Sequence, residues 1–175
     1  MADRMKIWIA DKMKDLMKKK PIEKIRITEI CANAEIERST FYYHFRDKYE
    51  LVAWIFFQDA NATNIIDPKD SAAALNKMKQ DILFYKRAYE DTSQNALWQY
   101  MLEYFVAAYT DLAKTMTESP MLDSQTLFSI RLYCYGAVGM TKEWVLQDNI
   151  TSAETLVQMM FHSMPSSLRA IYFPG

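Results

Sequence analysis

The residues that break helices are confined to a few points of this sequence. The chain has 175 residues, of which three are glycine and five are proline, and long stretches carry neither. Because glycine and proline are the strongest interruptions of helical backbone, the stretches between them favour helices. We therefore expect an all-α protein, interrupted at Pro21, Pro68, Pro120, Pro165 and Pro174.

The composition is that of an ordinary globular protein. Half of the residues are apolar and a quarter are charged, which excludes a disordered or fibrous chain. The N-terminal stretch lacks the apolar segment and cleavage site of a signal peptide, and no window approaches the roughly 18 apolar residues of a membrane span. We therefore expect a cytoplasmic protein that has no membrane association. Basic residues gather near the start, where residues 1–50 hold 12 Lys and Arg against 9 Asp and Glu.

The first helix is predicted from a repeat of apolar residues. From Met5 to Met17 they recur at steps of three and four, the period of one helix face. Lysines follow in the last turn, where cations suit the helix C-terminus, and Pro21 ends the helix. The pattern predicts a helix over about 3–19.

Two short helices and a longer one are predicted next. Thr28 is a suitable N-cap for a helix over about 28–34, and a break follows at residues 35–37. The segment "RSTFYYHF" then provides two turns of a second short helix. Asp47, with Glu50 three residues later, has the spacing of a capping box at the start of the longer helix.

The rest of the chain predicts longer and more apolar helices. Asp70 or Ser71 is expected to cap a helix that runs to about Tyr89, and "DTSQN" at residues 91–95 is a polar break. Later helices are predicted over 96–117, 124–147 and, capped by Thr151 or Ser152, to about residue 163.

Two short helices joined by a three-residue turn are what a helix-turn-helix motif requires. Phe41 and Phe45 lie four residues apart and can hold the inner face of the second helix. Small hydroxyls near the start of such a helix can approach base edges, while longer polar side chains reach phosphates. The outer surface is then expected to carry Arg38, Ser39, Thr40, Tyr43 and His44, with Tyr42 beside them and Lys48 in the next helix.

The stretch "ITEICANAEIERSTFYYHFRDKYEL" resembles the DNA-binding signature of the TetR family of transcriptional regulators. The resemblance implies three N-terminal helices that bind DNA and a C-terminal helical domain that dimerises and often holds a small ligand. We accordingly place a DNA-binding domain at residues 1–47 and a regulatory and dimerisation domain at residues 48–175. The segments "YKRAYE" and "YCYGAVGMTKEW" are similar to those of a Firmicutes-type subgroup of the family.

Carried over position by position, the resemblance implies DNA contacts for a defined set of residues. Thr28 would cap the second helix next to a phosphate. The groove would be faced by Arg38, Ser39, Thr40 and Tyr43, and the DNA backbone by Tyr42, His44 and Lys48.

The sequence departs from the family pattern at two acidic residues. Glu35 stands where glycine is usual, so either it adopts a left-handed conformation or the turn differs slightly, at a cost of about 1 kcal/mol or more. Glu37 stands where a Ser or Thr cap is usual, and it brings a negative charge close to DNA. Either the DNA affinity is modest or a base amino group is the partner of Glu37.

Two glycines inside a long predicted helix suggest a dimer interface. Each costs roughly 1 kcal/mol relative to alanine in a helix interior, and the close approach of another helix would explain this cost. Residues 124–147 with the last helix are therefore the candidate for a homodimeric interface, and packing within one chain is the alternative. The interface is expected to include Tyr135, Gly136, Gly139 and Met140.

A run of aromatic residues suggests either a ligand pocket or a core. Apolar clefts with a few phenolic hydroxyls bind small molecules, although aromatic residues at helical spacing are also typical of a core. The candidate pocket residues are Tyr85, Trp98, Tyr104, Phe105 and Tyr109.

No enzyme motif is present. The chain has two histidines, and it lacks a nucleophile elbow, a phosphate loop or metal-ligand spacing, so we expect no cofactor and no metal. We predict a homodimeric regulator that binds a palindromic operator in double-stranded DNA and is modulated by a small-molecule effector or a protein co-regulator. The alternative is an adaptor whose C-terminal helices bind a co-regulator, with DNA contact secondary.

Overall fold

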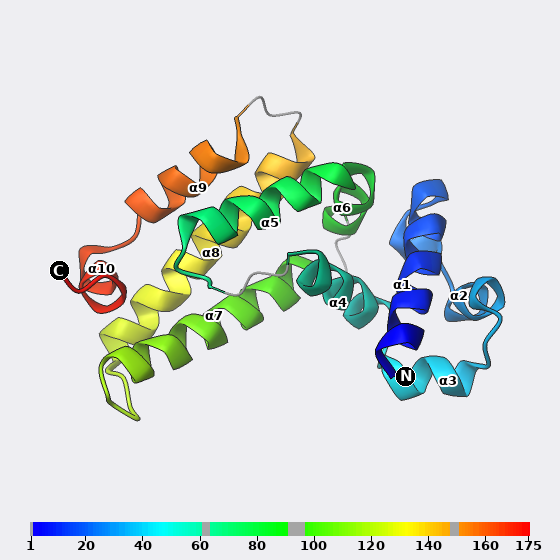
Figure 1. Ribbon diagram of the computed structural model, residues 1–175, viewed down its shortest axis with the longest axis horizontal. Helices are drawn as coiled ribbons and strands as arrows, with labels where there is room; N and C mark the ends of the chain where they lie inside the picture. The colour runs from blue at the N-terminus through cyan, green and yellow to red at the C-terminus, as the bar shows by residue number, and fades with distance from the viewer. Residues whose placement is uncertain (1, 61–63, 91–96, 148–150) are drawn as a thin grey trace.

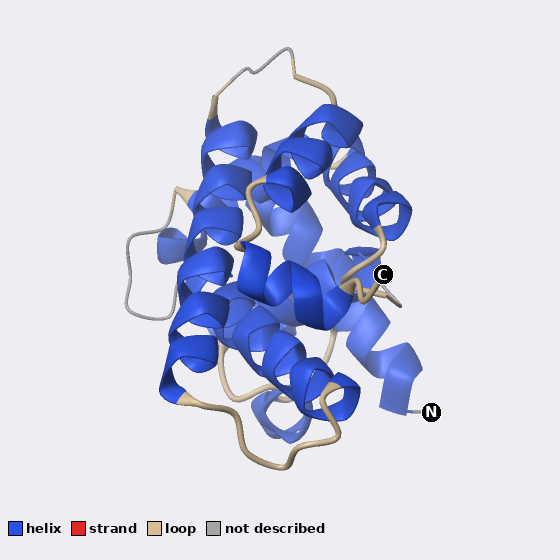
Figure 2. Cartoon of the chain, turned by 90° about the vertical axis from the view of Figure 1, so that its left-hand side faces the viewer, coloured by secondary structure: helices blue, strands red, loops and turns tan. Residues whose placement is uncertain are grey.

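The computed structural model describes residues 2–60, 64–90, 97–147 and 151–175. Every regular element in these ranges is a helix (Figure 2), which confirms the predicted all-α class. The N-terminal helices lie at one end of the long axis of the molecule, and α10 with the C-terminus lies at the other (Figure 1).

The first helix has nearly the bounds that the apolar repeat predicts, about 3–19. The elements of the N-terminal part are α1 (Ala2–Lys19), the 3-10 turn η1 (Ile22–Lys24), α2 (Ile27–Ala34), α3 (Arg38–His44) and α4 (Lys48–Ala60). After the two predicted domains, we call residues 1–47 the reading head and residues 48–175 the regulatory part. The predicted capping of the longer helix is confirmed, because Asp47 Oδ1 accepts hydrogen bonds from the backbone N–H of Tyr49 (2.9 Å) and Glu50 (2.8 Å).

The predicted cap of α2 is wrong. The N-cap position belongs to Arg26, whose backbone N–H donates to the Glu29 carboxylate at 2.9 Å, and Thr28 is exposed inside the first turn. Lys20 also donates to that carboxylate. The hydrogen bond from Lys20, followed by that from the Arg26 backbone, lowers the pKa of Glu29. Glu29 thus takes the capping role that the spacing had assigned to Thr28.

Beyond α4, the described residues of the regulatory part form two more helices than predicted, because the helix expected to reach Tyr89 is divided in two and a further helix follows Pro165. Its helices are α5 (Pro68–Gln80), α6 (Ile82–Tyr89), α7 (Leu97–Met116), α8 (Ser124–Leu146), α9 (Ala153–His162) and α10 (Ser166–Tyr172). The predicted polar break at residues 91–95 lies outside the described residues.

The predicted helix to Tyr89 is two helices, and its predicted cap is wrong. Asp67 is the N-cap, since it accepts from the backbone N–H of Lys69 at 2.8 Å, and Pro68 occupies the first position, which favours proline. The backbone leaves the helical conformation at Asp81 (φ −125°, ψ 44°). There the chain turns from packing on α9 to packing on α1 and α8.

Two hydrophobic clusters hold the molecule together. The larger runs without interruption from α1 through α4 into α5, α6 and α8, so the reading head and the regulatory part share one core. The smaller lies at the far end, where α10 packs on α7 and α8. Polar bonds reinforce the junction, since Lys14 pairs with Asp59 (2.8 Å) and Asp81 (3.4 Å), and Arg87 donates to the Met17 carbonyl.

Candidate nucleic-acid interface

Two buried phenylalanines hold α3 against the core, and its outer face is exposed. Phe41 and Phe45 are both buried, as predicted, and their rings lie 6.0 Å apart. Tyr43, by contrast, exposes 81% of its surface, and Tyr42 is also exposed. Because large aromatic side chains are usually buried, these tyrosines form an exposed surface that the fold itself does not require.

The remaining predicted contacts lie on or beside the same surface. Arg38 and Ser39 are exposed, whereas Thr40 and His44 are half-buried. Arg38 Nη2 donates to the Tyr42 hydroxyl at 3.4 Å, and its guanidinium lies 5.8 Å from the Tyr42 ring centroid. Arg38 and Tyr42 therefore contact each other on the exposed surface of α3.

The turn before α3 has the left-handed residue that the sequence suggested. Glu35 has φ 54° and ψ 44°, and its backbone N–H donates to the Ala32 carbonyl at 3.3 Å. Trp8 of α1 donates its indole N–H to the Ala34 carbonyl at 2.8 Å. Sequence reasoning missed this contact, because it joins residues 26 positions apart. The α1 helix thereby fixes the end of α2 and the angle at which α3 departs.

Glu37 is the one acidic residue at the start of α3. It occupies the N-cap position in an extended conformation (φ −75°, ψ 153°), and its side chain makes no capping hydrogen bond. The carboxylate is exposed. Its negative charge therefore stays at the entrance of the helix, on the surface that the tyrosines occupy.

Lys48 has a structural partner that its sequence position did not reveal. Its ammonium group donates to the backbone carbonyls of Ile22 (2.7 Å), Ile25 (2.9 Å) and Glu23 (3.2 Å). An ammonium group has three donors, so these bonds tie the start of α4 to η1. A phosphate contact by Lys48 would have to replace one of them.

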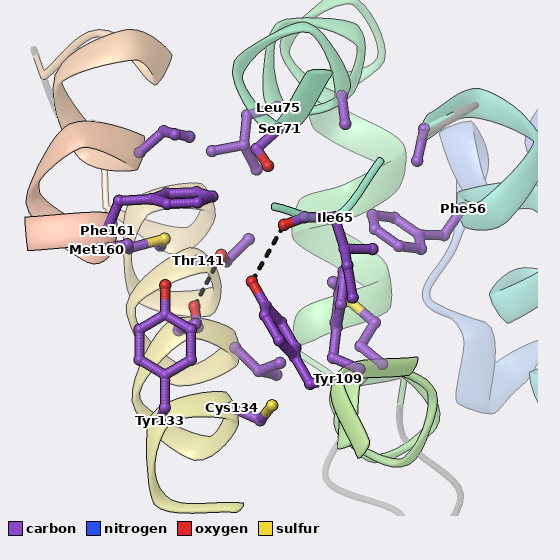
Figure 3. Close-up of a pocket in the computed structure, with 17 residues that line it drawn as sticks. Phe56, Ile65, Ser71, Leu75, Tyr109, Tyr133, Cys134, Thr141, Met160 and Phe161 are labelled. Atoms are coloured by element: carbon purple, nitrogen blue, oxygen red, sulfur yellow. Dashed lines mark hydrogen bonds between the residues drawn. The ribbon is translucent and has the colours of Figure 1, made fainter. Parts of the chain in front are cut away.

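The candidate pocket residues do not converge on one cavity. A cavity of about 90 Å³ lies between α4, α5, α7, α8 and α9 (Figure 3), and Phe105 and Tyr109 line it. Trp98 lies outside the lining of this cavity. Tyr85 is buried and donates to Asp59 at 2.8 Å, and Tyr104 packs on Phe57 of α4 with ring centroids 4.3 Å apart.

The walls of this cavity are apolar and uncharged. The Tyr109 hydroxyl donates to the Ile65 carbonyl (3.0 Å) and Thr141 Oγ1 donates to the Ala137 carbonyl (2.9 Å), as the dashed lines in Figure 3 show. Burial raises the pKa of the Cys134 thiol and of the Tyr133 hydroxyl to about 12, so both stay neutral at physiological pH. The walls therefore match a neutral and mainly apolar molecule, but the cavity is smaller than the roughly 300 Å³ of ordinary small-molecule sites and would have to expand to hold one.

The outer face of α8 carries an apolar surface with glycines at its centre. A Cβ atom added at Gly136 or Gly139 would meet nothing within 4 Å, so close packing inside the described chain does not explain either glycine. Tyr135 and Met140 are exposed beside them. We call the exposed apolar residues of this face the α8 stripe: Phe128, Leu132, Tyr135 and Met140.

The described residues offer no sign of a metal site or a membrane anchor. No group of three or more His, Cys, Asp or Glu side chains is placed to hold a metal ion in those ranges. None of the helices described is long and apolar enough to cross a membrane.

An exposed recognition helix, held by a buried face and a three-residue turn, defines the chain as a helix-turn-helix transcriptional regulator. Two family models match it, one for bacterial regulatory proteins of the tetR family over residues 9–55 and one for a transcriptional regulator C-terminal region over residues 71–166. The chain belongs to the TetR family.

Two comparisons lead to the same kind of relative. The chain is 41% identical over 51 residues to the HTH-type dhaKLM operon transcriptional activator DhaS of Lactococcus lactis. The match covers 29% of this chain and 27% of that protein, so it spans about a quarter of the relative's length. A solved structure of the dihydroxyacetone kinase operon activator DhaS shares the fold, with a TM-score of 0.63 at 19% identity over 95% of this chain and 97% of that one.

Proposed function

We propose that the chain binds a palindromic operator as a homodimer and that α3 reads the DNA. The observation that carries the proposal is the contrast inside α3, where Phe41 is buried while Tyr43 is almost fully exposed. Recognition helices have this division, because one face must pack and the other must reach base edges. The DNA-contact set is the predicted one: Thr28, Arg38, Ser39, Thr40, Tyr42, Tyr43, His44 and Lys48.

The second part of the proposal concerns the α8 stripe. One reading head contacts few bases, so such proteins present two heads to half-sites about 34–36 Å apart. The open space above Gly136 and Gly139 leaves room for a helix of a second copy to approach closely. Exposed apolar side chains around the glycines would then be buried, which favours association.

The apolar cavity is the proposed effector site. Its lining includes Met101 of α7 and Phe56 of α4, and α4 continues directly from the reading head. A molecule that enlarges the cavity would shift α4 and with it the spacing of the two heads. The relative DhaS is named as an operon activator, and activation of a neighbouring operon is accordingly one outcome that we propose for this chain.

A co-regulator protein is the second candidate for the α8 and α9 surface. An apolar groove of about 360 Å³, lined by Leu132, Gly136, Met140 and Met159, runs between these helices. The adaptor alternative would use this groove for the co-regulator, and the chain would then be a monomer on its own. The oligomeric state therefore separates the two candidates.

The experiment uses the full chain and the DNA that flanks its own gene. Mobility-shift titrations at several salt concentrations are expected to show a saturable complex whose affinity falls with salt, because phosphate contacts release counterions. Arg38→Ala is expected to weaken it. The absence of a saturable complex would reject the DNA-binding proposal.

The oligomeric state is tested with a matched pair of exposed leucines. Leu132→Glu in the α8 stripe is expected to give monomers in sedimentation experiments, whereas Leu83→Glu, a comparably exposed leucine on α6, is expected to stay dimeric. If the unchanged chain sediments as a monomer, the co-regulator alternative replaces the homodimer.

A further inference from the structure

The turn between α2 and α3 contains a residue in an unfavourable backbone conformation. Glu35 is in the left-handed region, with φ 54° and ψ 44°. A residue that carries a Cβ atom is less stable there, by a factor of about five or more in population. In this form the Ile36 backbone N–H donates to the Cys31 carbonyl at 3.0 Å, which closes the end of α2 and turns the chain toward α3.

The carbonyl just before Glu35 is held by a side chain of α1. Trp8 Nε1 donates to the Ala34 carbonyl at 2.8 Å, and no backbone N–H of the described residues donates to that oxygen. This carbonyl belongs to the peptide that joins Ala34 to Glu35, so the bond restrains the φ angle of Glu35. A hydrogen bond of this kind changes a population by a factor of roughly two to ten, which is similar to the cost of the left-handed conformation.

Burial in the core does not account for a tryptophan at position 8. Trp8 exposes 44% of its surface, whereas Ile9 and Met13 on the inner face of α1 are fully buried. The ammonium group of Lys12 lies 4.0 Å from the Trp8 ring centroid, a distance at which a cation–π contact restrains the ring. Trp8 is therefore held at the surface with its N–H directed to the end of α2.

A second turn of the same kind lacks such a bond. Glu118, beyond the end of α7, is also left-handed (φ 50°), and the Ser119 backbone N–H donates to the Lys114 carbonyl at 3.0 Å. The Thr117 carbonyl corresponds to that of Ala34, and within the described ranges no indole donates to it. A left-handed glutamate thus does not require an indole, and the turn before α3 has a restraint that the turn after α7 does without.

We propose that Trp8 is the positioning residue for α3, because its bond to Ala34 offsets the cost of the left-handed Glu35. Helix α3 begins three residues after Glu35, so a change in the backbone angles there would swing α3 as a unit. Hydrogen bonds to base edges require defined distances, whereas the attraction to phosphates does not depend on sequence. Loss of the restraint would therefore reduce sequence discrimination. This effect on DNA rests on the proposed function, whereas the effect on the turn does not.

The first test measures the turn without DNA, as hydrogen exchange of the Ile36 amide in the full chain. Trp8→Phe keeps a ring beside Lys12 and removes the donor, so exchange is expected to become about fivefold faster. Adding Glu35→Gly is expected to restore the parent rate, because it removes the backbone cost that the lost bond had offset. Adding Glu118→Gly instead, the same substitution in the other turn, is expected to leave exchange fast.

The second test measures DNA discrimination as the ratio of affinities for the duplex that flanks the gene and for an unrelated duplex. Trp8→Phe is expected to lower this ratio about fivefold, and Trp8→Phe with Glu35→Gly is expected to recover it. Trp144→Phe is the matched control, since it also removes an indole N–H bond to a carbonyl, that of Thr151 at 2.9 Å, but in the regulatory part. It is expected to lower stability while leaving the ratio and the exchange of Ile36 unchanged.

Three results would overturn the inference. The first is Ile36 exchange that Trp8→Phe does not change, and the second is equal rescue by Glu35→Gly and Glu118→Gly. The third is faster exchange with the parent ratio of affinities, since Trp8 would then hold the turn without directing α3. A chain that shows the expected exchange but binds no duplex confirms the role of Trp8 in the turn and contradicts only the proposed function.

Discussion

Two helices of this protein use tyrosine in opposite ways. In α3, Tyr43 exposes 81% of its surface, whereas in α7 Tyr109 exposes 6%. The Tyr109 hydroxyl donates to the Ile65 carbonyl, and its ring packs edge-on against Tyr133 and Tyr172. The Tyr43 ring meets only the edge of the half-buried His44, with centroids 4.9 Å apart.

The difference separates a tyrosine that holds the fold together from one that we propose contacts DNA. For a buried tyrosine, packing and a hydrogen bond within the chain offset the free-energy cost of removing its hydroxyl group from water. An exposed tyrosine contributes little to stability, so its role in α3 is expected to appear only when DNA is bound. The predictions below test this contrast, from the largest expected effect to the smallest.

Tyr109→Ala is expected to lower the free energy of unfolding by about 3–5 kcal/mol, because it opens a void beside the apolar cavity and removes the bond to Ile65. Denaturant titration followed by circular dichroism measures the effect. Tyr109→Phe, which keeps the ring, should cost about 1–3 kcal/mol. If Tyr109→Ala has the same free energy of unfolding as the parent, Tyr109 does not stabilise the fold and its contrast with Tyr43 is wrong.

Tyr43→Ala is expected to leave the free energy of unfolding within about 0.5 kcal/mol of the parent. Its specific DNA binding should weaken by about 1–3 kcal/mol, a factor of roughly 5 to 150. Mobility shifts against specific and unrelated duplexes check this. If Tyr43→Ala unfolds the reading head instead, the exposed tyrosine has a structural role that its contacts do not show.

Lys48→Met separates a structural role from a DNA-binding role. The loss of donors to the carbonyls of Ile22, Glu23 and Ile25 is expected to cost about 1–3 kcal/mol of stability. The slope of log affinity against log salt should fall by about one if Lys48 also neutralises a phosphate. An unchanged slope with reduced stability would remove Lys48 from the DNA contacts.

The predictable features were those set by near neighbours in the sequence. Phe41 and Phe45 lie one turn apart, so their shared burial follows from helix geometry. The left-handed Glu35 stands at the turn position where the family resemblance implies glycine. In contrast, the contacts of Lys48 with η1 and of Trp8 with Ala34 join residues more than 20 positions apart, and no local pattern marks them.

The regulatory part was harder to predict for the same reason. Tyr85 and Tyr104 belong to the aromatic run that suggested a pocket, yet both pack on α4, a helix far away in sequence. Proline marks the breaks correctly but not the helix that follows, since Pro68 begins α5 and Pro165 directly precedes α10, a helix that the sequence did not predict. Proline suits the first helical position as well as the position after a helix.

Glu37→Gln tests whether the acidic residue at the entrance of α3 repels DNA. The side chain caps nothing, so stability should not change, and affinity for all duplexes is expected to rise by about 0.5–1 kcal/mol. Glu118→Gln, which removes the same charge beyond the end of α7, is the control and should have no effect. If Glu37→Gln instead weakens binding to one sequence only, the carboxylate accepts from a base amino group.

The smallest effect concerns the Glu29 carboxylate that caps α2. Its pKa in the folded chain is lowered below the ordinary 4.5 by Lys20 and the Arg26 backbone, so its contribution is complete above pH 4.5 and is lost as the pH falls through the lowered value. Asp123 and Glu154 also have lowered pKa values, so the parent alone cannot isolate Glu29. The parent should therefore be compared with Glu29→Gln, whose stability deficit is expected to shrink as the pH falls below about 4.5. A deficit that is the same at every pH would show that the side chain, not its charge, supports the cap.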